Sequence, residues 1–403
     1  GHPSGWPFFM SGENKMTPKS LMSIAPKPEI IFTHGQGDYL YDAENNAYLD
    51  FMQGWAVNAL GHSPKALVEA INTQASRLIN PSPAFYNQPA IQLADTLCKL
   101  SGLDQVFFTN SGAEANEGAI KLARKWGQTQ PNKPWKIISF QNGFHGRTLA
   151  TMSASGKAAF EPLFNPKVDG FIKLPFNDIE AVKSAIKSDV CAVMLELIQG
   201  EAGVVPATKA FVKELRAVTQ AANILLIVDE VQTGVGRTGK MFCFENYQIT
   251  PDIMTLGKGL GGGVPIAAML AQNQVCCFEH GDQGGTFNGN PLMTAAAQVV
   301  VDTVSEPNFL HQVEHRHQQL VSGLTQLSSK FGMGEVRGQG LLLALDTGDI
   351  SANKIAEKAR TSYGLLINAP RENTLRFMPA LNVSESAIDE LLERLAKAID
   401  EVA

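Results

Sequence analysis

Cysteine is scarce in this chain of 403 residues. The five cysteines are scattered, odd in number and form no CxxC pair: Cys98, Cys191, Cys243, Cys276 and Cys277. Such a set argues against a disulfide framework and against a structural zinc site, so we expect no bound metal. It favours a reducing compartment, and we therefore expect the protein to be cytoplasmic.

Long apolar runs and an excess of basic residues are also missing. No apolar run is long enough to span a bilayer, so we expect no membrane partner. The formal net charge of −6 provides no electrostatic footprint for nucleic acid. The content of 44% hydrophobic and 18% charged residues is that of a soluble globular enzyme, and the length allows a large core and two domains.

The first residues lack both the basic start and the apolar core of a secretion signal. We expect residues 1–15 to be an expression-derived or disordered segment, with Met16 as the natural start. In the next segment, 16–65, the stretch DYLYDAENNAYLDFM (38–52) has two alternating apolar parts around a turn-rich AENN. This pattern predicts a β-hairpin, which we expect to join a smaller domain formed mainly by the C-terminal part of the chain.

From about residue 66 short apolar runs alternate with helical stretches. The runs are QVFFTN (105–110), KIISF (136–140), VCAVMLE (190–196), ILLIVD (224–229), IMTL (253–256) and AAMLA (267–271). Runs that are apolar at every position suit strands buried on both faces of a parallel sheet. The alternation predicts a large three-layer α/β/α domain with a mainly parallel sheet over 66–305. Amphipathic helices followed by RGQGLLLALD and NTLRFMPALNV predict a smaller α+β domain over 306–403.

Polar residues follow five of these predicted strands, at the edge where open α/β sheets bind their ligands. They are the NSGAE stretch from Asn110, the NGFHGRT stretch from Asn142, Glu196 with Glu201, Asp229 with Gln232, and Lys258. Each is ordinary by itself: Ser111 with Glu114, for example, is a capping box. Five at successive strand ends favour one polar site, in which the helix start at Ser111 and Gly112 receives a phosphate.

Lys258 lies in IMTLGKGLGGG, directly after a predicted buried strand. Most lysines are solvated surface charges, but glycines bring the backbone close to this one, and a crowded lysine loses its proton readily. Pyridoxal phosphate needs such a lysine for its aldehyde, an acid for its ring nitrogen and N–H donors for its phosphate. Asp229 is the predicted acid.

Three further residues are predicted to contact this cofactor. Gln232 is placed to hydrogen-bond the ring hydroxyl. Phe144 is a candidate to stack on the ring, with core packing as the alternative. Thr286, in GGTFNGNP, is a candidate phosphate ligand, with an ordinary turn residue as the alternative.

A second hypothesis comes from Gly234-Val-Gly-Arg-Thr-Gly-Lys240, which fits the GxxxxGK pattern of a nucleotide-binding P-loop. Met241 stands where that motif has the hydroxyl residue for Mg²⁺, and Asp229-Glu230 separates the strand from the glycines. Both points disfavour an NTPase. A non-catalytic binding protein would explain the fold but not the pairing of Lys258 with Asp229.

Seven motifs together resemble one known family over nearly the whole chain after residue 16. They are SGAEANEGAIKLAR, FHGRTLA, ELIQGEAGV, LIVDEVQTGVGRTGK, TLGKGLGGG, GTFNGNP and LRFMPAL. They are those of the class III (ornithine-type, fold-type I) aminotransferases, and they are most similar to the branch that acts on acetylornithine. The resemblance implies pyridoxal 5'-phosphate as cofactor and a homodimer with shared active sites.

The resemblance also implies a role for each cofactor-binding position. Lys258 would bond the cofactor and move a proton, Asp229 would pair with the ring nitrogen, and Gln232 with the ring oxygen. Ser111, Gly112 and Ala113 would hold the phosphate of one subunit. Thr286 would reach the phosphate of the neighbouring subunit.

For the substrates, the resemblance implies that Arg147 binds a carboxylate through its guanidinium fork. Arg376 would be neutralised by Glu201 while the amino donor is bound, and freed for the α-carboxylate of glutamate. A purely structural ion pair between domains is the alternative for these two residues. Glu196 would line the site.

Two departures from the family pattern concern Leu197 and Gly54. Leu197 replaces a proline of E-P-x-Q-G-E, a backbone detail. Gly54 stands where ornithine δ-aminotransferases have a tyrosine, which leaves room for an acylated α-nitrogen. The expected reaction moves the δ-amino group of N²-acetyl-L-ornithine to 2-oxoglutarate, a step of arginine biosynthesis. Succinylornithine, succinyldiaminopimelate, free ornithine and GABA remain alternative donors.

Overall fold

The computed structural model describes residues 20–403, so the segment predicted at 1–15 lies outside the described residues. Its largest sheet has seven strands in the order β4-β12-β11-β10-β7-β5-β6. They are β4 (Gln105–Thr109), β12 (Ala267–Ala271), β11 (Ile253–Leu256), β10 (Leu225–Asp229), β7 (Val190–Leu195), β5 (Lys136–Phe140) and β6 (Phe171–Leu174). All pairs are parallel except those of β12, which is antiparallel to β4 and β11. The mainly parallel sheet is confirmed, and β6 is the strand that no apolar run predicted.

The apolar runs form the middle of this sheet because both of its faces are covered. Every residue of β7 and β10 is buried. Leu225 and Ile227 of β10 pack in the cluster that includes α4 (Gly112–Thr129), whereas Leu226 and Val228 pack in the cluster that includes α7 (Lys209–Ala221). Alternate side chains of one strand therefore enter two apolar layers, as expected for a three-layer α/β/α arrangement.

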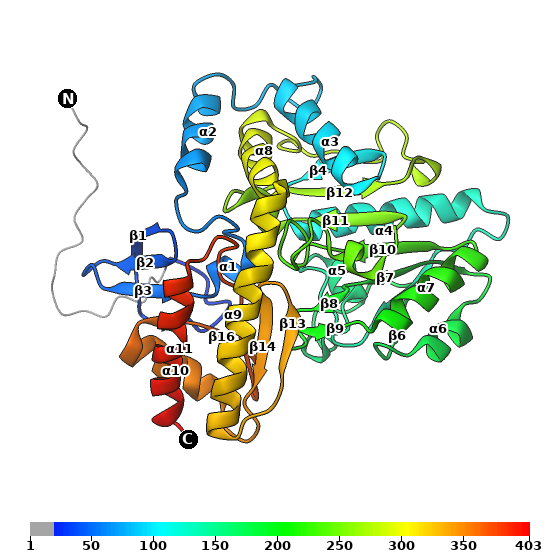
Figure 1. The fold of residues 1–403 in the computed structure, drawn as a ribbon. Coiled ribbons are helices and arrows are strands. Elements are labelled where there is room, and N and C mark those ends of the chain that lie inside the picture. Colours follow the sequence, from blue (N-terminus) through cyan, green and yellow to red (C-terminus); the bar gives the residue numbers. More distant parts are fainter. Residues whose placement is uncertain (1–19) are drawn as a thin grey trace.

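Three helices pack together beside β4: α2 (Lys65–Ala75), α3 (Gln88–Ser101) and α8 (Pro291–Ser305). After Glu306 the chain continues directly into the long α9 (Pro307–Phe331), which contacts strands and a helix of the C-terminal part of the chain. Figure 1 shows α9 running from the helices above the large sheet down to the strands of a smaller sheet. Helices α8 and α9 thus connect the helices beside the large sheet with the C-terminal part of the chain.

The smaller sheet is antiparallel, with the order β13-β14-β17-β16. Its strands are β13 (Val336–Gln339), β14 (Leu342–Asp346), β17 (Thr374–Phe377) and β16 (Asn368–Arg371). A third sheet contains β1 (Phe32–Gln36), β2 (Tyr39–Asp42), β3 (Ala47–Asp50) and β15 (Leu365–Leu366). The antiparallel β2–β3 pair confirms the hairpin predicted within 38–52.

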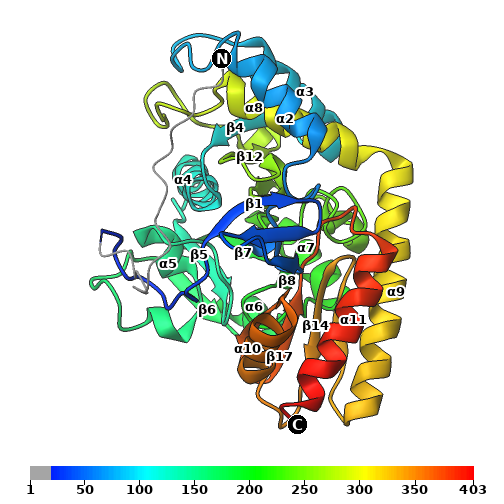
Figure 2. The ribbon, with the colours of Figure 1, turned by 90° about the vertical axis from the view of Figure 1, so that its left-hand side faces the viewer.

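The N-terminal hairpin lies against the C-terminal part of the chain. Strand β3 pairs with β15, which directly follows α10 (Ala352–Tyr363). Figures 1 and 2 show the hairpin beside α10 and α11 (Glu385–Asp400). The division into domains at 16–65, 66–305 and 306–403 stays a prediction.

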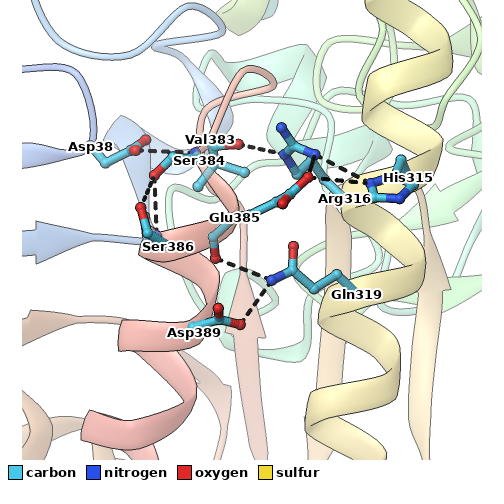
Figure 3. A network of polar contacts seen from close by, with 10 residues as sticks. Asp38, His315, Arg316, Gln319, Val383, Ser384, Glu385, Ser386 and Asp389 are labelled. Atoms are coloured by element: carbon cyan, nitrogen blue, oxygen red, sulfur yellow. Dashed lines mark hydrogen bonds and ion pairs between the residues drawn. The ribbon is translucent and has the colours of Figure 1, made fainter.

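Helices α9 and α11 are connected by polar contacts at their exposed side (Figure 3). Arg316 donates to the Glu385 carboxylate at 2.8 Å, and Gln319 donates to Asp389 at 2.9 Å. Such half-exposed contacts contribute little, about 0–1 kcal/mol each. Buried leucines such as Leu320 and Leu391 supply most of the stability of this pair.

Short elements complete the chain and carry several polar residues of interest. They are α1 (Gln53–Ala56), α5 (Leu149–Ala154), η1 (Ala158–Phe160), α6 (Ile179–Ala185), β8 (Ile198–Gln199), β9 (Val205–Pro206), η2 (Cys243–Tyr247), η3 (Lys258–Gly261) and η4 (Asn273–Val275). Over residues 20–403, no helix combines the length and the apolar character needed to cross a membrane.

Candidate active site

The segments that follow β4, β10 and β11 meet at the carboxyl edge of the large sheet. A Cβ added to Gly257 would lie 3.2 Å from Val231 Cγ1 and 3.4 Å from Gly112 Cα. A Cβ added to Gly112 would lie only 2.6 Å from Val231 Cγ1, so no larger residue fits there without a shift. The structure thus brings the helix start at Gly112, the loop after Asp229 and the residue before Lys258 into contact.

Lys258 begins the 3-10 turn η3 with a φ of 39°, in the left-handed region that non-glycine residues avoid. Its side chain is half-buried. Burial lowers the pKa of the Lys258 amine, against the raising effects of Asp229 and Glu196. A lysine with a lowered pKa has a larger neutral fraction and is a better nucleophile at neutral pH.

Asp229 ends β10, is buried and pairs in register with Thr255 on β11. Its Oδ2 accepts from His145 Nδ1 and from Asn116 Nδ2, both at 2.8 Å, and its Oδ1 accepts from the Val231 N–H at 3.0 Å. Burial opposes protonation of His145, but the hydrogen bond and charge of Asp229 raise the pKa of that imidazole. The carboxylate therefore has a fixed orientation.

Asn116 and Thr255 support Asp229 from behind. Asn116 Nδ2 also donates to the His145 carbonyl at 2.7 Å, and Thr255 Oγ1 donates to Asn116 Oδ1 at 2.7 Å. None of these contacts was predicted from the sequence. One feature of the sequence could have indicated them. Asn116 lies on the apolar stripe of α4 that continues with Ile120 and Ala123, and a polar side chain buried there needs hydrogen-bond partners.

The start of α4 combines a capping box with free donors. Ser111 Oγ accepts from the Glu114 N–H, and Glu114 Oε2 accepts from the Ser111 N–H at 3.1 Å. Over the part of the chain that the structure describes, the N–H groups of Gly112 and Ala113 donate to no protein acceptor. The free N–H groups and the helix dipole together favour an anion at this point.

Glu196, Phe144 and Arg147 form a second side of the site. The Phe144 N–H donates to Glu196 Oε2 at 2.9 Å, and burial raises the pKa of Glu196 to about 7. The exposed Arg147 guanidinium lies 5.8 Å from the ring centroid of Phe144 and 5.6 Å from that of Phe160. Among residues 20–403 it has no carboxylate partner, so its charge is available to a ligand.

Arg376 and Glu201 form an ion pair between β17 and the turn after β8. Arg376 is fully buried, and its Nη2 donates to Glu201 Oε1 at 3.0 Å while its Nε donates to Asn368 Oδ1 at 2.8 Å. Its Nη1 is buried and, among the described residues, has no hydrogen-bond partner. Burial lowers the pKa of Arg376, against the raising effect of Glu201.

Glu201 is shared by two cations. Its Oε2 lies 3.3 Å from Lys157 Nζ. Burial alone would raise the pKa of Glu201, but Arg376 and Lys157 outweigh it and lower that pKa. No role was predicted for Lys157, because nothing in the stretch around it indicates its distant partner.

Gln232 and Thr286 occupy different surroundings. Gln232 is buried, and a Cβ added to Gly200 would lie 1.7 Å from its Oε1, so a larger residue at position 200 would displace the end of the Gln232 side chain. Thr286 is exposed on a loop, where its carbonyl accepts from Asn80 Nδ2 at 3.3 Å. Within residues 20–403, no hydrogen bond joins Thr286 to the cluster around Lys258.

The stretch 234–240 does not have the surroundings of a P-loop. It leads into the short η2 instead of a long helix, and Lys240 is exposed. The buried Arg237 donates to the carbonyls of Leu341 and Pro379, so this loop packs on the small sheet and its neighbourhood. The geometry gives the NTPase hypothesis no support.

The fold and the site together define a class of enzyme. A half-buried lysine of lowered pKa, a fixed buried carboxylate and free N–H groups at a helix start are the donor set that pyridoxal 5'-phosphate requires, and they meet at one sheet edge. The architecture is that of the fold-type I enzymes that use this cofactor.

Comparison with known proteins identifies the family. The model of the family described as aminotransferase class-III matches residues 23–399, so the chain belongs to this family, and its members depend on pyridoxal phosphate. It is 54% identical over 378 residues to acetylornithine aminotransferase 2 of Bordetella bronchiseptica, covering 93% of this chain and 96% of that protein. It is 43% identical over 380 residues to a succinylornithine transaminase of Salmonella paratyphi A, covering 93% of each.

A solved structure gives the same result for the fold. Ornithine aminotransferase from Toxoplasma gondii, whose structure is described with partial occupancy of pyridoxal phosphate at its active site, superposes with a TM-score of 0.90. It is 31% identical, covering 95% of this chain and 92% of that one. The predicted family, fold class and cofactor are confirmed.

Proposed function

We propose that the protein transfers the δ-amino group of N²-acetyl-L-ornithine to 2-oxoglutarate, giving N-acetyl-L-glutamate 5-semialdehyde and L-glutamate, in arginine biosynthesis. The observation that carries this proposal is the unequal state of two arginines. Arg147 has no anionic partner, whereas Arg376 is paired with Glu201. A donor with one carboxylate needs one free guanidinium, and 2-oxoglutarate, with two carboxylates, needs both.

When bound, pyridoxal 5'-phosphate supplies an aldehyde that takes up the amino group and a ring that withdraws electrons from the adjacent carbon. Lys258 Nζ would bind the cofactor in the resting enzyme and then carry the proton between substrate and cofactor carbons. Its lowered pKa supports this task, because a base must be neutral to accept a proton. Asp229 would hold the proton on the ring nitrogen, in the orientation fixed by His145 and Asn116.

The remaining cofactor contacts belong to the same proposal. Gln232 would donate to the ring oxygen, and Phe144 would pack on the ring face. The free N–H groups of Gly112 and Ala113, with the Ser111 hydroxyl, would bind the phosphate.

The two substrates would use the arginines in turn. Arg147 would bind the α-carboxylate of acetylornithine and then the distal carboxylate of 2-oxoglutarate or glutamate. Arg376 would stay neutralised by Glu201 in the first case and take the α-carboxylate in the second, through its unpaired Nη1. Glu196 would line the site beside Phe144.

The preference for an acylated donor is supported at Gly54. This residue lies in α1, which packs against η3 and therefore near Lys258. It is exposed, and a Cβ added there would first meet Val57 at 3.4 Å. The absence of a side chain leaves space for an acyl group, and the relative named succinylornithine transaminase supports a succinylated donor as the second candidate.

A homodimer in the cytoplasm is part of the proposal. Large apolar side chains are exposed around the contact of Asn80 with Thr286: Leu78, Ile79, Phe85, Tyr86 and Phe287. Such a cluster marks a protein interface, and a partner subunit covering it would bring Thr286 to the neighbouring phosphate. The five free cysteines favour a reducing compartment.

Single-turnover absorbance changes with a panel of ω-amines test the proposal. The purified holoenzyme should react faster with N²-acetylornithine than with ornithine, GABA or succinyldiaminopimelate, with succinylornithine as the nearest competitor. Lys258→Ala should abolish the reaction. Faster reaction with free ornithine, or turnover by Lys258→Ala at the wild-type rate, would refute the assignment.

A further inference from the structure

Lys157 lies between the two arginines assigned to substrate carboxylates. Its Nζ is 3.3 Å from Glu201 Oε2, while Glu201 Oε1 accepts from Arg376 at 3.0 Å. The same Nζ lies 5.8 Å from the ring centroid of Phe160, and the Arg147 guanidinium lies 5.6 Å from that ring. One carboxylate and one aromatic ring therefore connect Lys157 to both arginines.

The three side chains of the ion-pair cluster differ in burial. The Arg376 side chain is 1% exposed, whereas those of Glu201 and Lys157 are 28% and 30% exposed. Arg376 is held in place by Asn368, but Glu201 follows the short strand β8 and has room on its solvent side. Glu201 is therefore the member that would move if a ligand took Arg376 as the proposed function requires.

We propose that Lys157 is a positioning residue for Glu201: it retains the Glu201 carboxylate as counter-ion when a substrate α-carboxylate displaces it from Arg376. The inference rests on the proposed function, since it concerns the same site. It assigns a specificity role to a residue to which the proposed function gives no contact with cofactor or substrate.

Charge balance gives the physical reason. Before displacement the cluster holds two cations, Arg376 and Lys157, and one anion, Glu201. The incoming α-carboxylate makes the charges equal. Without Lys157, one cation would face two carboxylates at Arg376, whose side chain is 1% exposed, and an uncompensated charge beside a buried group is costly.

The direction of the effect on each half-reaction follows. With acetylornithine, Glu201 keeps Arg376 as partner, so loss of Lys157 matters little. With 2-oxoglutarate, Glu201 would lose its last cation, and the equilibrium would return to the Arg376–Glu201 pair. Loss of a half-buried ion pair of this kind corresponds to a weakening of 2-oxoglutarate binding by about fivefold.

The test is Lys157→Gln, measured as single-turnover rates against substrate concentration. We expect the half-saturation concentration for 2-oxoglutarate to rise about fivefold, with the limiting rate and the acetylornithine half-reaction changed less than about twofold. Lys173→Gln is the matched control, because Lys173 is 29% exposed, pairs with Glu161 at 3.4 Å and lies outside the site. It should change neither half-reaction.

A double-mutant cycle separates this role from direct binding of substrate by Lys157. In a Glu201→Ala background, Lys157→Gln should have no further effect on 2-oxoglutarate, because its partner is gone. An equal effect in both backgrounds, or equal losses in both half-reactions, would overturn the inference. Failure of wild-type protein to react with either substrate would instead refute the proposed function, so the two failures are distinguishable.

Discussion

Replacing Arg376 by glutamine is the most direct perturbation of dual substrate binding. The buried guanidinium offers an unpaired Nη1 and an Nη2 that is now given to Glu201, so a carboxylate that displaces Glu201 gains two charge-assisted bonds. Hydrogen bonds to charged groups are worth about 1.5–3 kcal/mol. Net loss of one of them corresponds to a slowing of about 10- to 150-fold, and it should fall on the half-reaction with 2-oxoglutarate or glutamate.

The half-reaction with acetylornithine should change much less, because Arg376 is neutralised while that donor is bound. The substitution also has a structural cost: Asn368 Oδ1 loses its donor, which costs about 1–3 kcal/mol of stability. Both half-reactions are therefore measured well below the melting temperature of the variant, with the folded fraction checked by circular dichroism.

Arg216→Gln provides the matched control for the loss of an arginine that pairs with a carboxylate, and the Arg216 side chain is only 13% exposed. Arg216 donates to both Asp252 oxygens, at 2.7 and 2.9 Å, away from the proposed active site. It should lower the melting temperature while leaving both half-reactions within about twofold. If Arg376→Gln slowed both half-reactions equally, the Arg376–Glu201 pair would be purely structural and the reasoning would be refuted.

Three further outcomes are expected. Gly200→Ala should displace Gln232 and weaken cofactor binding about fivefold in equilibrium titrations. Gly118→Ala on α4 is the control, because the nearest atom to its new Cβ would lie at an ordinary 3.5 Å, and it should leave the affinity unchanged. Unchanged affinity in both variants would refute the role of Gln232. Burial raises the pKa of Glu230 from 4.5 to about 8, so between these pH values the folded state keeps a proton that the unfolded state releases. The free energy of unfolding therefore falls as pH rises from 4.5 to 8, by up to about 5 kcal/mol. Glu230→Gln should remove this loss, and parallel falls in Tm of both proteins between pH 6 and 8.5 would contradict it. Thr286→Ala subunits mixed with Lys258→Ala subunits should form hybrid dimers. In such a dimer one site combines the intact Lys258 of one subunit with the intact Thr286 of the other, so the activity should exceed that of either parent. No gain despite subunit exchange would place Thr286 in its own subunit's site.

Much of the large sheet was predictable because its strands are buried on both faces. A run such as ILLIVD, apolar at each position, reports its surroundings without reference to any partner. Strand β6 was missed because its FIKL sequence is short, half-buried and contains a lysine, like many edge strands and loops. Strand β15 has only two residues and exists through its pairing with β3, more than 300 positions earlier.

The candidate site was predictable in so far as its residues follow strands. Parallel strands bring their carboxyl ends to one edge, so position in the chain was enough to group Asp229, Glu196 and Lys258. The supporting contacts depend instead on side-chain directions that no local pattern encodes. Asn116 reaches Asp229 across 113 positions, and Lys157 reaches Glu201 across 44.

The ion pair between Arg376 and Glu201 has a consequence for how new substrate preferences arise. Asp229, which is assigned to the cofactor ring, lies at the edge of the large sheet and is held by a hydrogen-bonded network of Asn116, His145 and Thr255. The charges assigned to substrate choice lie on β17, on the turn after β8 and at Lys157, with no hydrogen bond to that network among the described residues. A directed-evolution library confined to these three places can therefore sample acceptor acids while leaving the hydrogen bonds around Asp229 in place. The two parts are still linked by charge, because Arg376 lowers and Glu201 raises the pKa of Lys258, so a change of substrate choice also retunes the catalytic base.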